Sequence, residues 1–246
     1  MTAAPLLAVD DVHAYYDQSH VVQGVSLTVG AGEIVGLVGR NGAGKTTILK
    51  TIMGVVRARR GHIRLAGQDI TQMATHDIAR AGLTLVPEDR RIFPALTVAE
   101  NLRVGTLAVG EMRDGRGDGA PPATLEQVFE YFPRLSERLH HTGQHLSGGE
   151  QQMLALARGL LAQPRLMLVD ELTGGLMPIL VESLMEILQR INARGMTVLL
   201  VEQDLGVVLD LAHRCYVLDQ GRIQFHGTAD ELRANHAIQQ RYLGVS

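Results

Sequence analysis

Short apolar runs alternate along the chain with longer stretches in which apolar residues recur every three or four positions. The uninterrupted runs at 34–38 and 166–169 are typical of strands that are buried on both faces. The stretches 153–161 and 179–192 have the spacing of helices with one apolar side. Strands that alternate with helices predict an α/β protein with a mostly parallel sheet covered on both faces.

The remaining elements have weaker patterns. Thr97 and Glu100 have the spacing of a capping box, which predicts that a helix starts there. Gly, Pro and charged residues fill 105–123, and we interpret this stretch as a surface loop. The other expected elements are short strands within 6–29, strands at 62–65, 83–86, 197–201, 214–218 and 222–226, helices at 75–81 and 124–139, and terminal helices.

A glycine-rich segment follows the strand 34–38 and precedes a helical pattern. It contains the motif G-x-x-x-x-G-K-T, in which glycines let backbone N–H groups turn inward around phosphate at a helix N-terminus. Lys45 is expected to reach the terminal phosphates, and the Thr46 hydroxyl is expected to coordinate Mg²⁺. The residues predicted to contact the nucleotide are Gly39, Asn41, Gly42, Ala43, Gly44, Lys45, Thr46 and Thr47.

Two adjacent acids end the apolar strand 166–169. Buried carboxylates are costly unless a metal or proton transfer uses them, and ligands bind at this end of parallel strands. We therefore predict that Asp170 holds Mg²⁺, directly or through water, and that Glu171 is the general base that orients the attacking water. The alternative is that both acids cap the following turn.

A second glycine pair occurs in Leu146-Ser147-Gly148-Gly149-Glu150, before a helix with one apolar face. Ser147 and Glu150 have the spacing of a capping box. The glycines additionally permit close approach to a bare helix N-terminus, where an anion is stabilised. We expect both interpretations to hold.

The composition and the weaker motifs narrow the class of protein. The 246 residues carry a net charge of −3, which gives no basic field for nucleic acid or an anionic membrane. The single cysteine, Cys215, suits a reducing compartment, and neither a signal peptide nor a spanning segment is evident. His141 and His145 are separated by Gly143 and lack a third ligand, so we favour no metal there. A guanine-reading Asn-Lys-x-Asp motif is absent, which disfavours a GTPase.

The phosphate loop, Leu146–Gln152 and the strand ending in Asp170-Glu171, in this order and spacing, resemble the ATP-binding subunits of ABC transporters. The resemblance covers nearly the whole chain and implies ATP and Mg²⁺ as ligands. It implies one ATPase domain with a RecA-like P-loop NTPase core (1–88 and 161–246), an antiparallel β subdomain and a helical subdomain (89–160). Two units would sandwich two nucleotides, with Ser147 and Gly149 completing the other unit's site, and Tyr16 stands at the adenine-stacking position.

Finer features resemble one branch of this superfamily. Glu88 stands where Gln is usual, at a position near the metal, and Gln203 replaces the usual histidine that contacts the γ-phosphate. With the ending 241–244, these residues resemble the second ATPase subunit of branched-chain amino-acid importers (LivF-type). Close relatives of this branch serve urea and short-chain amides, so the ATPase of a urea or amide importer is an alternative.

Three positions depart from the family pattern: Leu172 replaces proline, Gly174 replaces a bulkier residue, and Asp89 replaces glycine. The stretch 172–175 resembles the loop that crosses the dimer, and its glycines predict more flexibility than usual. Coupling between the two sites is the property that these departures would affect.

The resemblance also implies partners. We expect two permease subunits, a second ATPase subunit in a homo- or heterodimer, and a peripheral position on the cytoplasmic face of the inner membrane, with membrane contact only through the permease. One alternative is an exporter ATPase of the lipopolysaccharide type, which Gln and His at 88 and 203 would have favoured. Another is a non-transport ABC protein, which usually has paired units or long basic insertions that this chain lacks.

Overall fold

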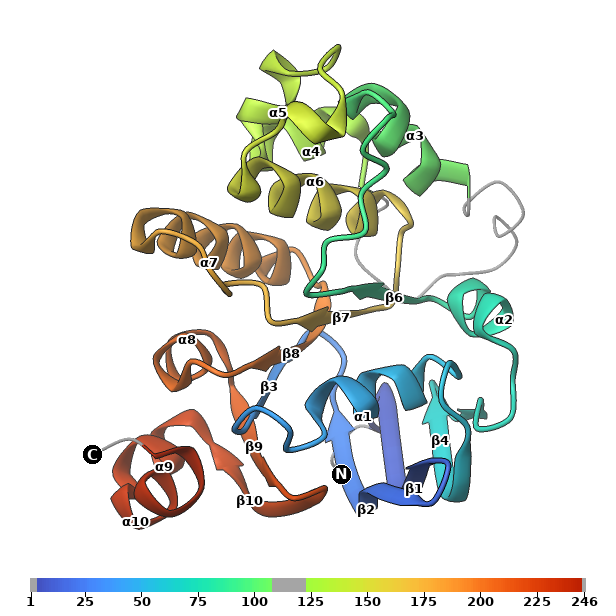
Figure 1. Ribbon diagram of the computed structural model, residues 1–246, viewed down its shortest axis with the longest axis vertical. Coiled ribbons are helices and arrows are strands. Elements are labelled where there is room, and N and C mark those ends of the chain that lie inside the picture. The colour runs from blue at the N-terminus through green and yellow to red at the C-terminus, as the bar shows by residue number, and fades with distance from the viewer. Residues whose placement is uncertain (1–3, 108–122, 245–246) are drawn as a thin grey trace.

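The computed structural model describes residues 4–107 and 123–244, which fold around two β-sheets (Figure 1). The strands are β1 (Leu7–Tyr16), β2 (Ser19–Val29), β3 (Ile34–Val38), β4 (Ala58–Leu65), β5 (Gln68–Asp69), β6 (Leu83–Val86), β7 (Leu166–Asp170), β8 (Thr197–Glu202), β9 (Arg214–Asp219) and β10 (Arg222–Thr228).

Helices connect and cover these sheets. They are α1 (Lys45–Ile52), α2 (Thr75–Arg80), α3 (Val98–Leu107), α4 (Leu125–Tyr131), α5 (Pro133–Glu137), α6 (Gly148–Leu161), α7 (Pro178–Ala193), α8 (Leu205–Leu211), α9 (Ala229–Ala234) and α10 (His236–Ile238), with a 3₁₀ turn at Gly143–His145 and a π turn at Gln239–Leu243. None of the helices in the described part of the chain is both long enough and apolar enough to cross a membrane.

The central sheet has six strands in the order β10-β9-β3-β8-β7-β6. All neighbouring pairs are parallel except β9 and β10, which form an antiparallel hairpin at one edge. The predicted α/β class with a mostly parallel sheet is therefore confirmed. The expected antiparallel β subdomain is the second sheet, with four strands in the order β2-β1-β4-β5.

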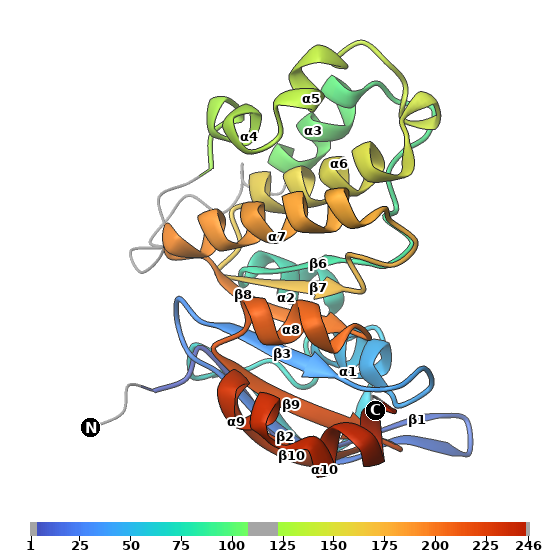
Figure 2. The ribbon, with the colours of Figure 1, turned by 90° about the vertical axis from the view of Figure 1, so that its left-hand side faces the viewer.

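The side chains of the central strands separate two cores. On β7, Met167 and Val169 pack with α6, α7 and α8, whereas Leu166 and Leu168 pack with α1 and the antiparallel sheet. Burial on both faces explains why these strands are uninterrupted apolar runs. Figure 2 shows α7 and α8 side by side over one face of the sheet, and Figure 1 shows α1 on the opposite side.

The helices α3, α4, α5 and α6 form a group at one end of the molecule (Figures 1 and 2). Their buried residues, such as Leu102 and Phe132, belong to the same core as α7 and α8. The capping box predicted at Thr97 is present, because Thr97 and Glu100 exchange hydrogen bonds at 2.8 and 3.2 Å. The helical group α3–α6 therefore shares a core with α7 and α8, the helices that cover one face of the central sheet.

Several sequence expectations need correction. The short strands expected within 6–29 are two long strands, because Tyr16 pairs with Ser19 across a tight turn. The surface loop expected at 105–123 starts too early, since α3 continues to Leu107 where Gly105 packs against Arg158 of α6. Residues 108–122 of that stretch lie outside the described residues. The helix expected over 124–139 is broken at Phe132, because the following Pro133 starts a new helix.

Candidate functional site

The phosphate loop lies between the carboxyl end of β3 and the start of α1. Gly44 caps α1 with a φ of 106° and Gly42 has a φ of 80°, conformations that residues with a Cβ rarely adopt. A Cβ on Gly39 would collide with the carbonyl oxygen of Leu218 on β9. The loop thus depends on its glycines for shape, and it presents the free N–H groups of a helix N-terminus.

The loop is also fixed to the rest of the fold. The Gly221 N–H donates a hydrogen bond to the Ala43 carbonyl at 2.9 Å, and Gln23 donates to Gly221 at 2.8 Å. Ala43 and Thr47 are buried, whereas Asn41 is exposed at the tip of the loop. The cradle is therefore supported by the β9–β10 turn and by β2.

Lys45 and Thr46 connect the loop to the acids of β7. The Lys45 ammonium is buried, donates to the Gly39 and Arg40 carbonyls at 2.8 and 3.3 Å, and lies 3.1 Å from Glu171 Oε1. The Thr46 hydroxyl donates to Asp170 Oδ1 at 3.3 Å. The structure thus brings together the four residues that sequence reasoning assigned to phosphate, metal and water.

Asp170 and Glu171 have different environments. Asp170 is buried, which raises its pKa to about 6; the Thr46 hydroxyl opposes this rise, and the charges of Glu171 and Glu88 add to it. Glu171 has a φ of 45°, a strained conformation for a residue with a side chain. Strain of this kind, worth about 1–3 kcal/mol, is concentrated at functional sites.

Other predicted site residues follow the carboxyl ends of neighbouring parallel strands. Because β6, β7, β8 and β3 are consecutive in the sheet, Glu88, Asp170 and Gln203 lie along the same edge as the phosphate loop. Both Glu88 and Gln203 are exposed. This edge is where open parallel sheets bind ligands.

The aromatic pair Tyr15-Tyr16 is divided between two roles. Tyr15 is partly buried and stacks on His20 with ring centroids 4.2 Å apart, and the Arg59 guanidinium lies 4.5 Å from its centroid. Tyr16 ends β1 and is 44% exposed. Tyr16 is therefore the one with a ring accessible for stacking on a base.

Ser147 and Gly149 begin α6, and the predicted capping box is present. Ser147 N–H donates to Glu150 Oε2 at 2.8 Å and the Ser147 hydroxyl accepts from Glu150 N–H at 3.3 Å. A Cβ on Gly149 would lie 2.6 Å from Leu180 Cδ1 of α7, so a larger residue there would require the Leu180 side chain to shift. Both views place α6 in the helical group and α1 beyond the central sheet, so one chain does not bring this helix end to its own phosphate loop (Figures 1 and 2).

Glu202 is a residue to which sequence reasoning gave no role. It ends β8 immediately before Gln203 and is 2% exposed. Burial raises the pKa of Glu202 to about 7. Two hydrogen bonds from Thr173 oppose this rise, and the charge of Glu171 adds to it. The signal was available, because an acid at the end of an apolar strand was the observation that identified Asp170.

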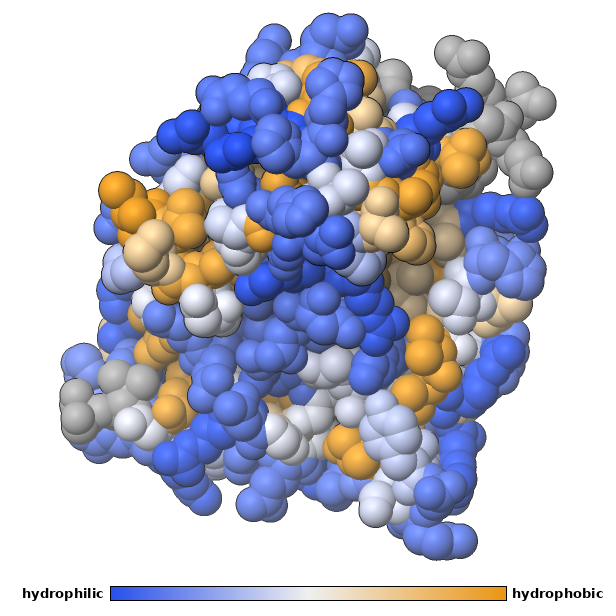
Figure 3. All heavy atoms as spheres, turned by 45° about the horizontal axis from the view of Figure 1, so that its top comes forward, coloured by the Kyte–Doolittle hydropathy of each residue, from blue (hydrophilic) through white to orange (hydrophobic). Residues whose placement is uncertain are grey.

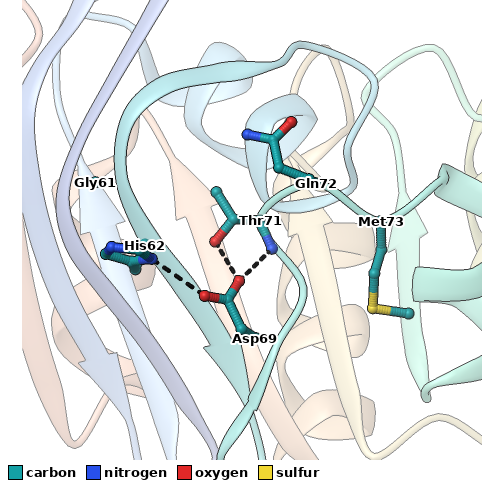
Figure 4. Close-up of a pocket in the computed structure, with 6 residues that line it drawn as sticks. All are labelled: Gly61, His62, Asp69, Thr71, Gln72 and Met73. Atoms are coloured by element: carbon teal, nitrogen blue, oxygen red, sulfur yellow. Dashed lines mark hydrogen bonds and ion pairs between the residues drawn. The ribbon is translucent and has the colours of Figure 1, made fainter.

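A pocket of about 520 Å³ lies away from the phosphate loop, beside β4 and β5 (Figure 4). Asp69 accepts hydrogen bonds from the Thr71 hydroxyl and N–H, which lower its pKa to about 2, and His62 lies 3.1 Å from its other oxygen. These contacts fasten the turn after β5. We interpret this pocket as structural.

The residues at this site fit a magnesium ion if the phosphates of a bound nucleotide supply the remaining ligands. Within residues 4–107 and 123–244 no group of three or more His, Cys, Asp or Glu side chains is arranged to hold a metal. That His141 and His145 hold no metal stays an expectation; His145 Nδ1 lies 2.8 Å from the Thr142 hydroxyl oxygen. Mg²⁺ commonly uses one or two protein ligands plus substrate phosphates, which Asp170 and Thr46 match.

A glycine-rich cradle after a parallel strand, a buried lysine and an acid at the end of another strand of the same sheet define a P-loop nucleotide-binding protein. A family model described as ABC transporter matches residues 22–174. The chain belongs to the ABC transporter family, as an ATPase of the kind that is coupled to transport.

Individual relatives agree with this assignment. The high-affinity branched-chain amino acid transport ATP-binding protein BraG of Pseudomonas aeruginosa is 41% identical over 239 residues, which cover 97% of this chain and 100% of that protein. The lipopolysaccharide export system ATP-binding protein LptB of Escherichia coli is 35% identical over 229 residues, 93% of each chain.

Solved structures share the fold. The ADP conformation of MJ1267, an ATP-binding cassette of an ABC transporter, superposes with a TM-score of 0.79 at 25% identity, over 95% of this chain and 94% of that one. An ATP-binding subunit of an ABC transporter gives a TM-score of 0.77 at 29% identity, over 97% and 96% of the two chains.

Proposed function

We propose that the chain binds and hydrolyses ATP with Mg²⁺ to energise a membrane importer of branched-chain amino acids. The observation that carries the catalytic part is the contact of Lys45 and Thr46, which follow β3, with Glu171 and Asp170 at the end of β7. The identity to BraG supports the substrate class, together with Glu88 and Gln203. The alternative, a lipopolysaccharide exporter, has less support, because the identity to LptB is 35% rather than 41%. Glu88 and Gln203 also do not favour that class of exporter.

The proposed roles follow from the geometry and from phosphoryl-transfer chemistry. Lys45 and the loop N–H groups neutralise the phosphates, and Thr46, Asp170 and Glu88 hold Mg²⁺, which supplies further neutralisation of the phosphate charge when bound. Glu171 orients the attacking water. Gln203 donates a hydrogen bond to the γ-phosphate, and Tyr16 stacks on the adenine.

A second ATPase subunit completes each site in this proposal. The start of α6, with Ser147 and Gly149, belongs to the helical group and lies apart from the phosphate loop of the same chain, so it is available to a nucleotide held by a partner. Met177 and Ile179, at the neighbouring start of α7, are 64% and 71% exposed. Figure 3 shows a group of apolar side chains at the edge where α7 begins, and apolar surface of this kind favours a protein partner.

The wider architecture is proposed by the same reasoning. Residues 1–88 and 161–246 form the nucleotide-binding core and residues 89–160 form the helical subdomain. Two permease subunits contact the segment Glu88–Pro94, which joins the site to the helical group, and hold the chain at the cytoplasmic face of the inner membrane. This assembly needs no nucleic acid and no direct membrane contact.

Replacing Glu171 by glutamine tests the catalytic assignment. Glu171→Gln retains the shape of the side chain but loses the charge that orients water, so we expect ATP binding to persist while hydrolysis is nearly abolished. Size-exclusion chromatography should then show an ATP-dependent dimer. Glu231→Gln, a matched change in an exposed capping box, should hydrolyse at the parental rate. Parental turnover in Glu171→Gln would contradict the role given to Glu171.

A further inference from the structure

Both carboxylate oxygens of Glu202, at the end of β8, accept hydrogen bonds from the same residue, Thr173. Thr173 donates its backbone N–H to Glu202 Oε1 at 3.1 Å and its hydroxyl to Glu202 Oε2 at 3.0 Å. The two residues are 29 positions apart, so these bonds fasten the loop between β7 and α7 to the end of β8. We call this pair the Glu202–Thr173 clamp.

The clamp lies between the two residues that the proposed function assigns to the γ-phosphate and its attacking water. Thr173 follows Glu171 by two positions, and Glu202 directly precedes Gln203. The backbone N–H of Glu171 also bonds to β8: it donates to the Val201 carbonyl at 2.8 Å. Hydrogen bonds to β8 therefore hold the strained backbone of Glu171 at two points, its own N–H and Thr173 two residues later. A strained residue persists only where the surrounding structure fixes it in this way.

The residues around the clamp show why it matters for the loop. Leu172 is buried in the core, which anchors the residue between Glu171 and Thr173. The next two residues, Gly174 and Gly175, have no side chains that could pack, and Gly175 has a φ of 68°. Thr173 is therefore the last side-chain anchor before Leu176. Within the stretch 172–175, for which flexibility is expected, Leu172 and Thr173 are the residues with side-chain contacts.

A buried acid is a costly way to close a loop, because an apolar pair could do so without desolvating a carboxylate. A carboxylate that accepts two bonds from one residue, however, fixes both the position and the direction of the chain. Fixed geometry is valuable where hydrolysis depends on the placement of groups to within a fraction of an ångström.

We propose that Glu202 and Thr173 are positioning residues for ATP hydrolysis, whose paired hydrogen bonds fix Glu171 and Gln203 relative to each other. This inference rests on the roles proposed for Glu171 and Gln203. A clamp that served stability alone would weaken ATP binding and turnover together when broken. A positioning clamp instead lowers kcat while leaving KM for ATP nearly unchanged.

Four variants of the full chain separate these outcomes. Glu202→Leu removes both bonds and Thr173→Val removes only the hydroxyl bond. Thr173→Ser keeps both, and so does Glu202→Gln, whose amide oxygen accepts from the N–H while its NH₂ donates to the hydroxyl. We expect kcat to fall by about 10- to 100-fold in Glu202→Leu and about 3- to 10-fold in Thr173→Val, with KM within about twofold. The two conservative variants should stay within about threefold of the parent.

Amide hydrogen exchange of the peptide spanning 171–176 gives a second measurement that does not depend on hydrolysis. Exchange should rise in Thr173→Val and stay parental in Thr173→Ser, even if Glu202→Leu fails to fold. Thr228→Val is the matched control, because Thr228 also exchanges bonds with a glutamate, Glu231, but far along the chain at the start of α9. It should leave both kcat and the exchange of 171–176 unchanged.

The proposal is overturned if Thr173→Val keeps parental kcat, if KM rises as much as kcat falls, or if Thr173→Ser behaves like Thr173→Val. Glu171→Gln is assayed beside these variants. If Glu171→Gln abolishes turnover while Thr173→Val leaves it intact, the clamp fails and the proposed function stands. If Glu171→Gln hydrolyses ATP normally, the proposed catalytic role fails, and the positioning role fails with it.

Discussion

Substitution of Glu202 by glutamine should change how the stability of the protein depends on pH. Burial raises the pKa of Glu202 from 4.5 to about 7 in the folded chain. A difference of about 2.5 between the two pKa values, at about 1.4 kcal/mol for each tenfold change, corresponds to about 3 kcal/mol. Glu202 is 2% exposed, so solvent screening reduces this figure little.

The sign of the effect follows from the raised pKa. Below about pH 4.5 the carboxyl is protonated in both the folded and the unfolded chain and contributes no pH dependence. Between about pH 4.5 and pH 7 only the unfolded chain ionises, so the folded state loses stability as the pH rises. Above about pH 7 the full penalty is present. Glu202→Gln has no such penalty and should therefore become the more stable protein as the pH increases.

Urea unfolding followed by circular dichroism at pH 5, 6, 7 and 8 measures this difference. The free energy of unfolding of Glu202→Gln minus that of the parent should rise across the series by about 2–3 kcal/mol, with little change in the denaturant slope. Asp170, which also titrates in this range, is present in both proteins and cancels in the difference. A difference that stays constant from pH 5 to 8, or that falls, would refute the reasoning.

Further predictions concern the phosphate loop and the end of β8. Gln203→Ala should lose about 10²–10³ in turnover, the effect of removing one preorganised donor, with ATP affinity nearly kept. Gln203→His should retain activity and gain a pH-dependent limb between about pH 5 and 8 in steady-state assays; full activity in Gln203→Ala would remove the role. Gly39→Ala should lower ATP affinity at least about 10-fold by calorimetry, because the added Cβ meets Leu218 and the cradle must shift. The purified chain alone should bind no leucine by calorimetry, since no motif in it recognises a free amino acid; detectable binding would contradict that.

Local sequence signals predicted much of the fold and the centre of the site. The phosphate loop and the strand that ends at Asp170 combine a strict motif with an apolar run, so both could be recognised without knowing which distant strands they pair with. Capping boxes at Thr97 and Ser147 were also predicted, because each is contained within four residues.

What the sequence did not reveal depends on pairing between distant segments. The extension of the strands at 7–29 arises from hairpin register, and the bend at Phe132 arises where Pro133 starts a helix. The pairing of Thr173 with Glu202 was missed for the same reason: Glu202 ends an apolar strand as Asp170 does, but nothing near Thr173 in the sequence marks it as the partner. The flexibility expected for 172–175 from its two glycines stays a prediction, and Leu172 in that stretch is buried in the core.

The central claim, that this chain energises the import of branched-chain amino acids, is tested most directly by transport in proteoliposomes. The chain is purified together with the permease subunits that it binds, the complex is reconstituted, and uptake of labelled leucine is measured with ATP and the matching solute-binding protein. We predict ATP-dependent leucine uptake by the parental complex and none by the complex carrying Glu171→Gln. A reconstituted complex that hydrolyses ATP but takes up no leucine, isoleucine or valine would contradict the account.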